Sequence, residues 1–326
     1  MIRHTMRRSP LPSYPLIAAL ILALLLIMML LLFPTPAHGQ AGKRAPVRLP
    51  RARPEMLVSG EWLNKHLQDP SVVVLYVGRQ RIAYDAGHIP GARFVTLAEL
   101  AVARSGVPNE LPPVADLEKL FSGLGVGDRS RVILYDDAGG LLAARAYFTL
   151  DYLGHGDSAA LLDGGLESWK EDHLPISQSA PAYTPATFTA KVNPKVLATM
   201  ADVRDVVSSG HSGTVLVDAR PAGEYDGSKS AEGVPRAGHI PGAINLFWQK
   251  AEESKEDPEL LPPADLRKLY RDNGLAPGSQ VITYCRSGIQ ASHAYFTAKY
   301  LGYDVRMYDG SFSEWSKAAD TKVDKK

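Results

Sequence analysis

Cys285 is the single cysteine in the 326-residue chain, and its surroundings favour reactivity. It lies in the segment VITYCRSGIQASH, where an apolar run meets a glycine-containing turn and then an amphipathic stretch. A thiol at the amino-terminal end of a helix and beside Arg286 is favoured as thiolate, because the helix dipole and the guanidinium are both positive there. We therefore expect a lowered thiol pKa and a nucleophilic sulfur. The alternative is a buried cysteine that acts as a small hydrophobic residue.

The loop after this cysteine is predicted to bind an anion. A strand, a tight turn, and a helix beginning near Ala291 would direct successive backbone N–H groups at one point. Glycine allows the chain to curl at the turn. The predicted binding residues are the charged side chain after the cysteine and the loop that follows it, namely Arg286, Ser287, Gly288, Ile289 and Gln290.

The elements that must position this loop alternate between strands and helices. Short apolar runs rich in β-branched residues are typical of buried parallel strands. Apolar residues spaced three and four apart predict helices with one buried face over 141–154 and 291–302, each ending at glycine. This alternation predicts parallel sheets covered by helices on both faces, with ligands beyond the carboxyl ends of the strands. The predicted strands are VVVLYV at 72–77, RVILY at 131–135, TVLVDA at 214–219 and QVITY at 280–284.

The chain contains an internal duplication. The segment AGHIPGA occurs twice, 151 residues apart, and further matched blocks follow in the same order in both halves. We therefore predict one domain over 55–176 and a second over 195–320, joined by an extended connector rich in proline, alanine, serine and threonine over 177–194. The further blocks are VILYDDAGG and VITYCRSGI, AYFTLDYLG and AYFTAKYLG, and LDGGLESWK and YDGSFSEWSK.

These blocks make the chain resemble the tandem-domain rhodaneses, the thiosulfate and 3-mercaptopyruvate sulfurtransferase family. The resemblance rests on the tyrosine and HIPGA turn between Tyr84 and Val95, and on VRMYDGSFSEW between Val305 and Trp315. It implies an α/β fold of two rhodanese-like domains, each a parallel sheet flanked by helices on both faces. Asp136 takes the place of the cysteine in the first half, as in the non-catalytic amino-terminal domains of the family. One active site is therefore implied.

The resemblance implies that Cys285 takes sulfane sulfur from a small anionic donor as a persulfide and passes it to cyanide, a thiol or a protein. Thiosulfate is the leading donor, and 3-mercaptopyruvate is the alternative. In the family, thiosulfate enzymes tend to carry two basic residues after the cysteine, and mercaptopyruvate enzymes a glycine and a serine. Arg286 followed by Ser287 shares one of these features with each type of enzyme. Many relatives place a substrate-binding arginine where this chain has Glu224, which would repel an anion. Arg236 is the candidate replacement. A low-turnover persulfide carrier for one partner protein is a further alternative.

Other polar residues are assigned supporting roles. Asp218 and Arg220 are expected to form an ion pair that supports the active loop. His88 and His239 are interpreted as turn organisers that hydrogen-bond to backbone. Trp169 and Trp315 occupy equivalent places in the repeat and are expected to pack in the cores of the two domains.

Other kinds of chemistry have little support in the sequence. No metal or other cofactor is predicted, because one cysteine and scattered histidines give no ligand cluster. Related phosphatases and arsenate reductases need an arginine six residues after the cysteine, where this chain has Ala291.

The first forty residues are predicted to be a targeting segment. Residues 16–33 form an uninterrupted apolar run after three arginines, and small residues follow it, so we expect a signal peptide over 1–39 with cleavage after Gly39 and then a basic linker over 40–54. The protein is accordingly expected to be periplasmic or secreted. An uncleaved anchor facing the periplasm is the alternative, and it would be the only membrane contact.

The charge balance argues against nucleic acid as a partner. Three of the 36 Lys and Arg residues lie in 1–39, which leaves 33 basic residues against 35 acidic ones in the remainder.

Overall fold

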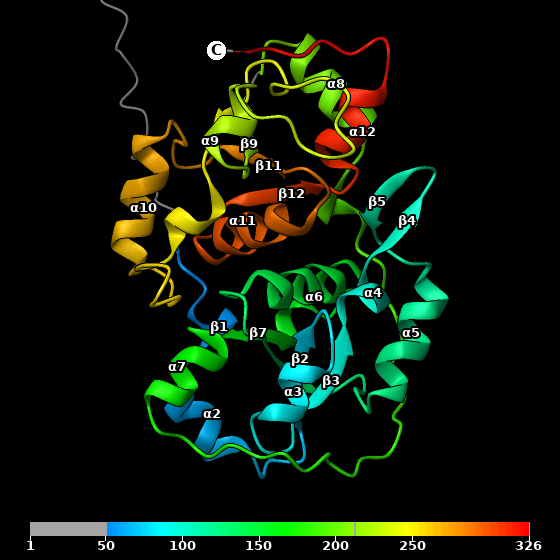
Figure 1. Ribbon diagram of the computed structural model, residues 1–326, viewed down its shortest axis with the longest axis vertical. Helices are drawn as coiled ribbons and strands as arrows, with labels where there is room; N and C mark the ends of the chain where they lie inside the picture. The colour runs from blue at the N-terminus through cyan, green and yellow to red at the C-terminus, as the bar shows by residue number, and fades with distance from the viewer. Residues whose placement is uncertain (1–50, 212, 326) are drawn as a thin grey trace, which may run out of the picture. The chain divides into compact units, whose positions relative to one another are not determined.

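The computed structural model describes residues 51–211 and 213–325, which form two similar halves within one compact unit. The predicted signal peptide over 1–39 and most of the predicted linker over 40–54 lie outside the described residues. Each half is built on a five-stranded sheet whose strands all run parallel, as the alternation of strands and helices predicts (Figure 1).

The first half has the strand order β1-β7-β6-β2-β3. A separate antiparallel hairpin, β4–β5, projects from this half. The strands of this half are β1 (Leu57–Val58), β2 (Val72–Gly78), β3 (Arg93–Thr96), β4 (Val102–Arg104), β5 (Val107–Glu110), β6 (Arg131–Tyr135) and β7 (Ala159–Leu162). Its helices are η1 (Pro54–Met56), α2 (Gly60–His66), α3 (Ile82–Ala86), α4 (Leu97–Leu100), α5 (Val114–Gly123), α6 (Leu141–Tyr152), η2 (Gly156–Ser158) and α7 (Gly165–Glu171).

The second half repeats this arrangement with the strand order β10-β9-β11-β12-β8. Its strands are β8 (Leu197–Ala198), β9 (Thr214–Asp218), β10 (Ile244–Asn245), β11 (Gln280–Tyr284) and β12 (Asp304–Tyr308). Its helices are η3 (Pro194–Val196), α8 (Met200–Ser208), α9 (Ala222–Tyr225), η4 (Trp248–Ala251), α10 (Pro263–Asp272), α11 (Ile289–Tyr300) and α12 (Ser311–Lys317).

Successive residues of the strands enter different cores. In β2, Val73, Leu75 and Val77 belong to one buried cluster, whereas Val74 and Tyr76 belong to another. This alternation follows from the two-residue period of a strand. Because both faces are apolar, each sheet is covered by helices on both sides, as expected for parallel sheets.

Helices α6 and α11 lie side by side between the two sheets (Figure 1). The repeated AYFT segments meet there in crossed aromatic pairs, Tyr147 with Phe296 and Phe148 with Tyr295, at ring-centroid distances of 4.9 and 5.2 Å. The sequence predicts one buried face for each helix, and this prediction is wrong. Nearly every residue of both helices is buried, because each helix contacts its own sheet and the opposite helix.

The predicted connector over 177–194 contains no helix or strand before Pro194, and it is bound tightly along the first half. Backbone hydrogen bonds join it to Ser122, Asp128 and Leu153, and Phe188 is buried against the core. Among the residues that the structure describes, no helix has both the length and the apolar character needed to cross a bilayer.

Candidate active site

Cys285 directly follows β11, a central strand of the second sheet, as the sequence predicts. Helix α11 begins at Ile289, two residues before the expected start. Gly288 caps this helix with φ of +88°, a left-handed conformation that favours glycine. The strand, turn and helix thus place the cysteine at the carboxyl edge of the sheet, where ligands of open α/β sheets bind.

Three amides of the loop favour the charged form of the cysteine. Hydrogen bonding from the backbone N–H groups of Ser287, Gly288 and Ala291 acts to lower the pKa of the Cys285 thiol. Two of these residues are among the predicted binding residues, and Ala291 is not. Ala291 follows the glycine turn by three residues, so its amide is one of those at the helix start that lack an intrahelical acceptor. Binding of substrate by Ile289 and Gln290 stays a prediction.

The environment of the thiol differs from the prediction in one respect. Only 1% of Cys285 is exposed, and it packs within the main hydrophobic cluster. Burial raises the pKa of the thiol, and this effect exceeds the opposing effect of the three amides. The expectation of a lowered pKa is therefore wrong for the free protein. The amides still favour negative charge on sulfur whenever a charged form is present.

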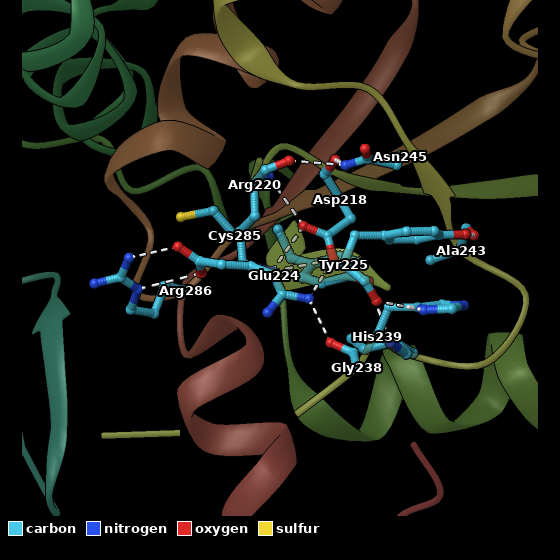
Figure 2. A network of polar contacts seen from close by, with 12 residues as sticks. Asp218, Arg220, Glu224, Tyr225, Gly238, His239, Ala243, Asn245, Cys285 and Arg286 are labelled. Carbon is cyan, nitrogen blue, oxygen red and sulfur yellow. Dashed lines mark hydrogen bonds and ion pairs between the residues drawn. The ribbon is translucent and has the colours of Figure 1, made fainter. Parts of the chain in front are cut away.

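Arg286 is paired with Glu224 instead of pointing freely into solution. Its guanidinium lies 2.6 Å from the carboxylate, and the arginine side chain is 42% exposed (Figure 2). From the sequence, Glu224 is expected to repel an anion. In the structure its carboxylate also neutralises Arg286, the cation next to Cys285 in the loop. An anionic donor must therefore compete with Glu224 for Arg286.

Asp218 and Arg220 form the predicted ion pair. Arg220 donates to both carboxylate oxygens of Asp218 and to the carbonyl of Gly238, and both charged residues are buried (Figure 2). The guanidinium also lies over the ring of Phe312 at 4.1 Å, and the Phe312 N–H donates to the carbonyl of Cys285. The pair therefore contacts the active loop through Phe312.

Arg236 does not serve the predicted substrate-binding role. Its guanidinium donates to the carbonyl oxygens of Trp315, Ser316, Ala318 and Thr321 and to the Thr321 hydroxyl. These acceptors lie at the carboxyl end of α12 and just beyond it, where unpaired carbonyl groups attract a cation. The prediction is wrong because this arginine is fully occupied in closing a helix.

The repeated histidines organise their turns, as predicted. His88 Nδ1 lies 2.8 Å from the carbonyl of Tyr84, and His239 Nδ1 lies 2.8 Å from that of Tyr225. The ring of His88 also stacks on that of Tyr84, and the ring of His239 on that of Tyr225, each at a centroid distance of 3.8 Å. The two repeated tryptophans, Trp169 and Trp315, are buried in their cores as expected.

The first half has a loop of the same kind, with Asp136 in place of the cysteine. One carboxylate oxygen accepts the N–H groups of Ala138 and Gly140, and the other accepts those of Leu142 and Ala143, at 2.6–2.9 Å. Burial raises the pKa of this carboxyl, and the four donors oppose that effect. The first loop therefore holds a permanent side-chain acceptor where the second loop holds a thiol.

The described residues contain no group of three His, Cys, Asp or Glu side chains arranged to hold a metal ion.

A family model named Rhodanese-like domain matches residues 59–172 and 199–318. The chain belongs to the rhodanese family. This tandem rhodanese is 34% identical over 287 residues to a protein named sulfur carrier protein TtuD of Thermus thermophilus, which covers 84% of the chain and 98% of the relative. It is 36% identical over 244 residues to a thiosulfate sulfurtransferase of Pseudomonas aeruginosa, which covers 74% of the chain and 87% of the relative.

The fold is also found among solved structures. The tandem rhodanese is similar, with a TM-score of 0.75 and 25% identity, to the anaerobic ergothioneine biosynthesis enzyme from Chlorobium limicola. The match covers 83% of the chain and 70% of that enzyme. The two relatives named for sulfur transfer, from Thermus thermophilus and Pseudomonas aeruginosa, support sulfur transfer as the general activity.

Proposed function

We propose that this tandem rhodanese transfers sulfane sulfur from thiosulfate to a thiophilic acceptor through a persulfide on Cys285. The observation that carries the proposal is the place of Cys285 between the end of β11 and the start of α11, where three backbone N–H groups favour a charged sulfur. Preorganised donors of this kind stabilise charge that develops on a reacting atom, at no further cost of reorganisation.

The reaction consists of two displacements. The Cys285 thiolate, formed by loss of its proton to solvent, attacks the outer sulfur of thiosulfate. The S–S bond of thiosulfate breaks, and sulfite leaves with the bonding electron pair. An acceptor thiolate or cyanide then attacks the outer sulfur of the persulfide and releases the Cys285 thiolate. The amides of Ser287, Gly288 and Ala291 would bind the negative sulfur in both steps.

The test is release of sulfite from thiosulfate and of pyruvate from 3-mercaptopyruvate, measured with cyanide or a thiol as acceptor. We expect turnover with thiosulfate, and one extra sulfur on Cys285 by mass spectrometry after incubation with the donor alone. Comparable turnover by Cys285→Ser would overturn the covalent mechanism. Turnover with 3-mercaptopyruvate alone would identify that compound as the donor.

A second candidate is a persulfide carrier for one partner protein. It is favoured by the pairing of Arg286 with Glu224, which leaves no free cation on Arg286 to attract a small anion. In this case the protein would acquire a stable extra sulfur but would show no turnover with either small donor and cyanide. Addition of a thiol-bearing partner protein would then be needed to release the sulfur.

We also propose that the protein acts outside the cytoplasm, on the basis of the apolar run over 16–33 and the small residues after it. Fractionation of cells that produce the full chain, with amino-terminal sequencing of the product, tests this. A mature protein that begins at Gln40 in the periplasm or medium is expected. An intact amino terminus in the membrane fraction would favour the anchor, and a cytoplasmic product would exclude export.

A further inference from the structure

The β4–β5 hairpin of the first half reaches the active loop of the second half. Its strands pair with a register shift between Val102 and Arg104, and Asn109 in β5 has φ of +61°. Asparagine tolerates this left-handed conformation better than most residues do. Such irregularities redirect side chains and are frequent next to active sites.

Asn109 contacts the loop directly. Its Nδ2 donates to Ser287 Oγ at 2.8 Å, and the N–H of Ser287 donates in turn to Cys285 Sγ. A single side chain of the first half is therefore two hydrogen bonds away from the reacting sulfur.

A buried ion pair across the two halves supports the same contact. Arg145, which is fully buried in α6, donates to Asp309 Oδ1 at 2.6 Å and to the carbonyl of Asn109 at 2.7 Å. The other oxygen of Asp309 accepts the N–H of Leu111 at 2.7 Å. Asp309 follows β12, so this pair joins the hairpin to the strand beside Cys285.

The ion pair also borders the glycine of the active loop. A Cβ atom at Gly288 would lie 2.9 Å from Asp309 Oδ1 and 3.1 Å from a terminal nitrogen of Arg145. Gly288 therefore packs directly against side chains held by the first half. Two of the three residues whose amides point at the sulfur, Ser287 and Gly288, have such a support.

The loop at Asp136 has no charged residue in the place that Arg145 occupies beside the loop at Cys285. In the repeat, His293 takes the place of Arg145, since the segments read ARAYFT and SHAYFT. Its ring lies 3.8 Å from the position of a Cβ atom at Gly140, but its Nδ1 has no hydrogen-bond partner, and burial lowers its pKa to about 4. The contacts of Arg145 are thus a feature of the loop that carries the cysteine.

We infer that the first half is part of the catalytic apparatus, and that Asn109 is a positioning residue that holds the amides of the active loop on Cys285. The inference rests on the proposed transfer through this cysteine. It gives the half without a cysteine a definite task, which is to fix the geometry of the amide cradle from outside the catalytic half.

The test uses Asn109→Gly in the full chain, because glycine accepts the left-handed backbone and removes only the side chain. We expect the kcat for sulfite release to fall about tenfold with less than a twofold change in KM, since the loosened amides act on the transition state. The pH profile of Cys285 alkylation by iodoacetamide should shift upward by about half a pH unit, because displaced amides favour the thiolate less.

Lys317→Ala is the matched control. Lys317 donates to the carbonyl of Gly106 at the tip of the same hairpin and does not touch the loop. It should behave as the wild type in both assays. An equal loss in Lys317→Ala and Asn109→Gly would overturn the inference, because general loosening of the hairpin would then explain both.

A double-mutant cycle with Ser287→Ala gives an independent measurement. If Asn109 acts through the Ser287 hydroxyl, the double variant should be no slower than the slower single variant. Additive losses, or a wild-type kcat and alkylation profile in Asn109→Gly, would refute the positioning role. Absence of turnover in the wild type itself would count against the proposed function only, because alkylation reports on the thiol without any sulfur donor.

Discussion

The loops at Asp136 and Cys285 occupy the same place in the two halves, but they hold different groups. In the first half four amides bind the two oxygens of a carboxyl side chain, and in the second half three amides bind one sulfur. The backbone provides an anion-binding cradle in both. What fills the cradle differs, because a carboxyl side chain occupies it in the first half, whereas a buried thiol occupies it in the second.

The rims of the two loops differ as well. The residue after the central group is Asp137 in the first half and Arg286 in the second. Glu252 covers the first loop, with a carboxylate oxygen 2.7 Å from the position of a Cβ atom at Gly139. The second loop has the part-buried Arg286–Glu224 pair instead. The first loop is therefore bordered by acidic groups, whereas the cation at the edge of the second is paired with a carboxylate.

The largest effect is expected from the residue that distinguishes the loops. Cys285→Ser should lower the rate of sulfite release from thiosulfate by at least about a thousandfold, because a hydroxyl cannot accept and release sulfane sulfur. The free energy of unfolding should change by less than about 1 kcal/mol, since the substitution is nearly isosteric. Retention of more than a tenth of the wild-type rate would show that the second loop does not carry the reaction.

In the first loop, Asp136→Ala should reduce stability and leave chemistry intact. It removes the acceptor of four buried N–H groups, so the free energy of unfolding should fall by about 3 kcal/mol. Denaturant unfolding measures this, and Asp136→Asn, which retains one acceptor oxygen, should give a smaller loss. If Asp136→Ala lost turnover while remaining fully folded, the assignment of a single active site would be wrong.

The carboxyl of Glu252, which covers the first loop, should make the free energy of unfolding depend on pH. Burial raises its pKa to about 8, so the folded protein favours the protonated carboxyl. Its contribution to stability is complete below the ordinary pKa of about 4.5 and is lost as the pH rises through about 8. Glu252→Gln should therefore be more stable than the wild type at pH 9, by up to about 5 kcal/mol, and similar to it at pH 4.

Thermal or denaturant unfolding across this pH range tests the role of Glu252. Parallel stability curves for the wild type and Glu252→Gln would contradict it.

The smallest effect concerns the rim of the second loop. Glu224→Gln would release Arg286 for an anionic donor, so the KM for thiosulfate should fall about fivefold, which corresponds to about 1 kcal/mol for a partly exposed pair. Arg286→Gln should raise the KM instead. Steady-state kinetics of both variants test the rim, and equal shifts in the same direction would show that the pair does not control the donor.

Much of the fold could be predicted from the sequence, because strong local patterns determine it. The β-branched runs before Asp136 and Cys285 and the repeated HIPGA turns gave the parallel sheets, the two halves and the structural histidines. The burial of α6 and α11 on nearly all sides could not be predicted, since it arises where the two halves meet. Helical periodicity alone does not report the neighbour on the second face.

The candidate site was predicted where it is local in the chain and missed where it is not. The cysteine, the loop that follows it and the Asp218–Arg220 pair are close in sequence or in adjacent strands. Asn109 and Asp309 were missed, because a contact between the halves leaves no sign in either segment alone. The thiol pKa was predicted in the wrong direction, because the local positive groups are visible in the sequence and the depth of burial is not.

The crossed pairing of Tyr147 with Phe296 and of Phe148 with Tyr295 means that the halves meet as the subunits of a twofold dimer do, with the same surface of each used once. An excised half would therefore expose the apolar surface of α6 or α11 to water and would tend to self-associate through it. Because the two halves are covalently linked, the half without the thiol always accompanies the half that has it. The sequence of the first half is therefore free to change in ways that support the second half and not the reaction itself.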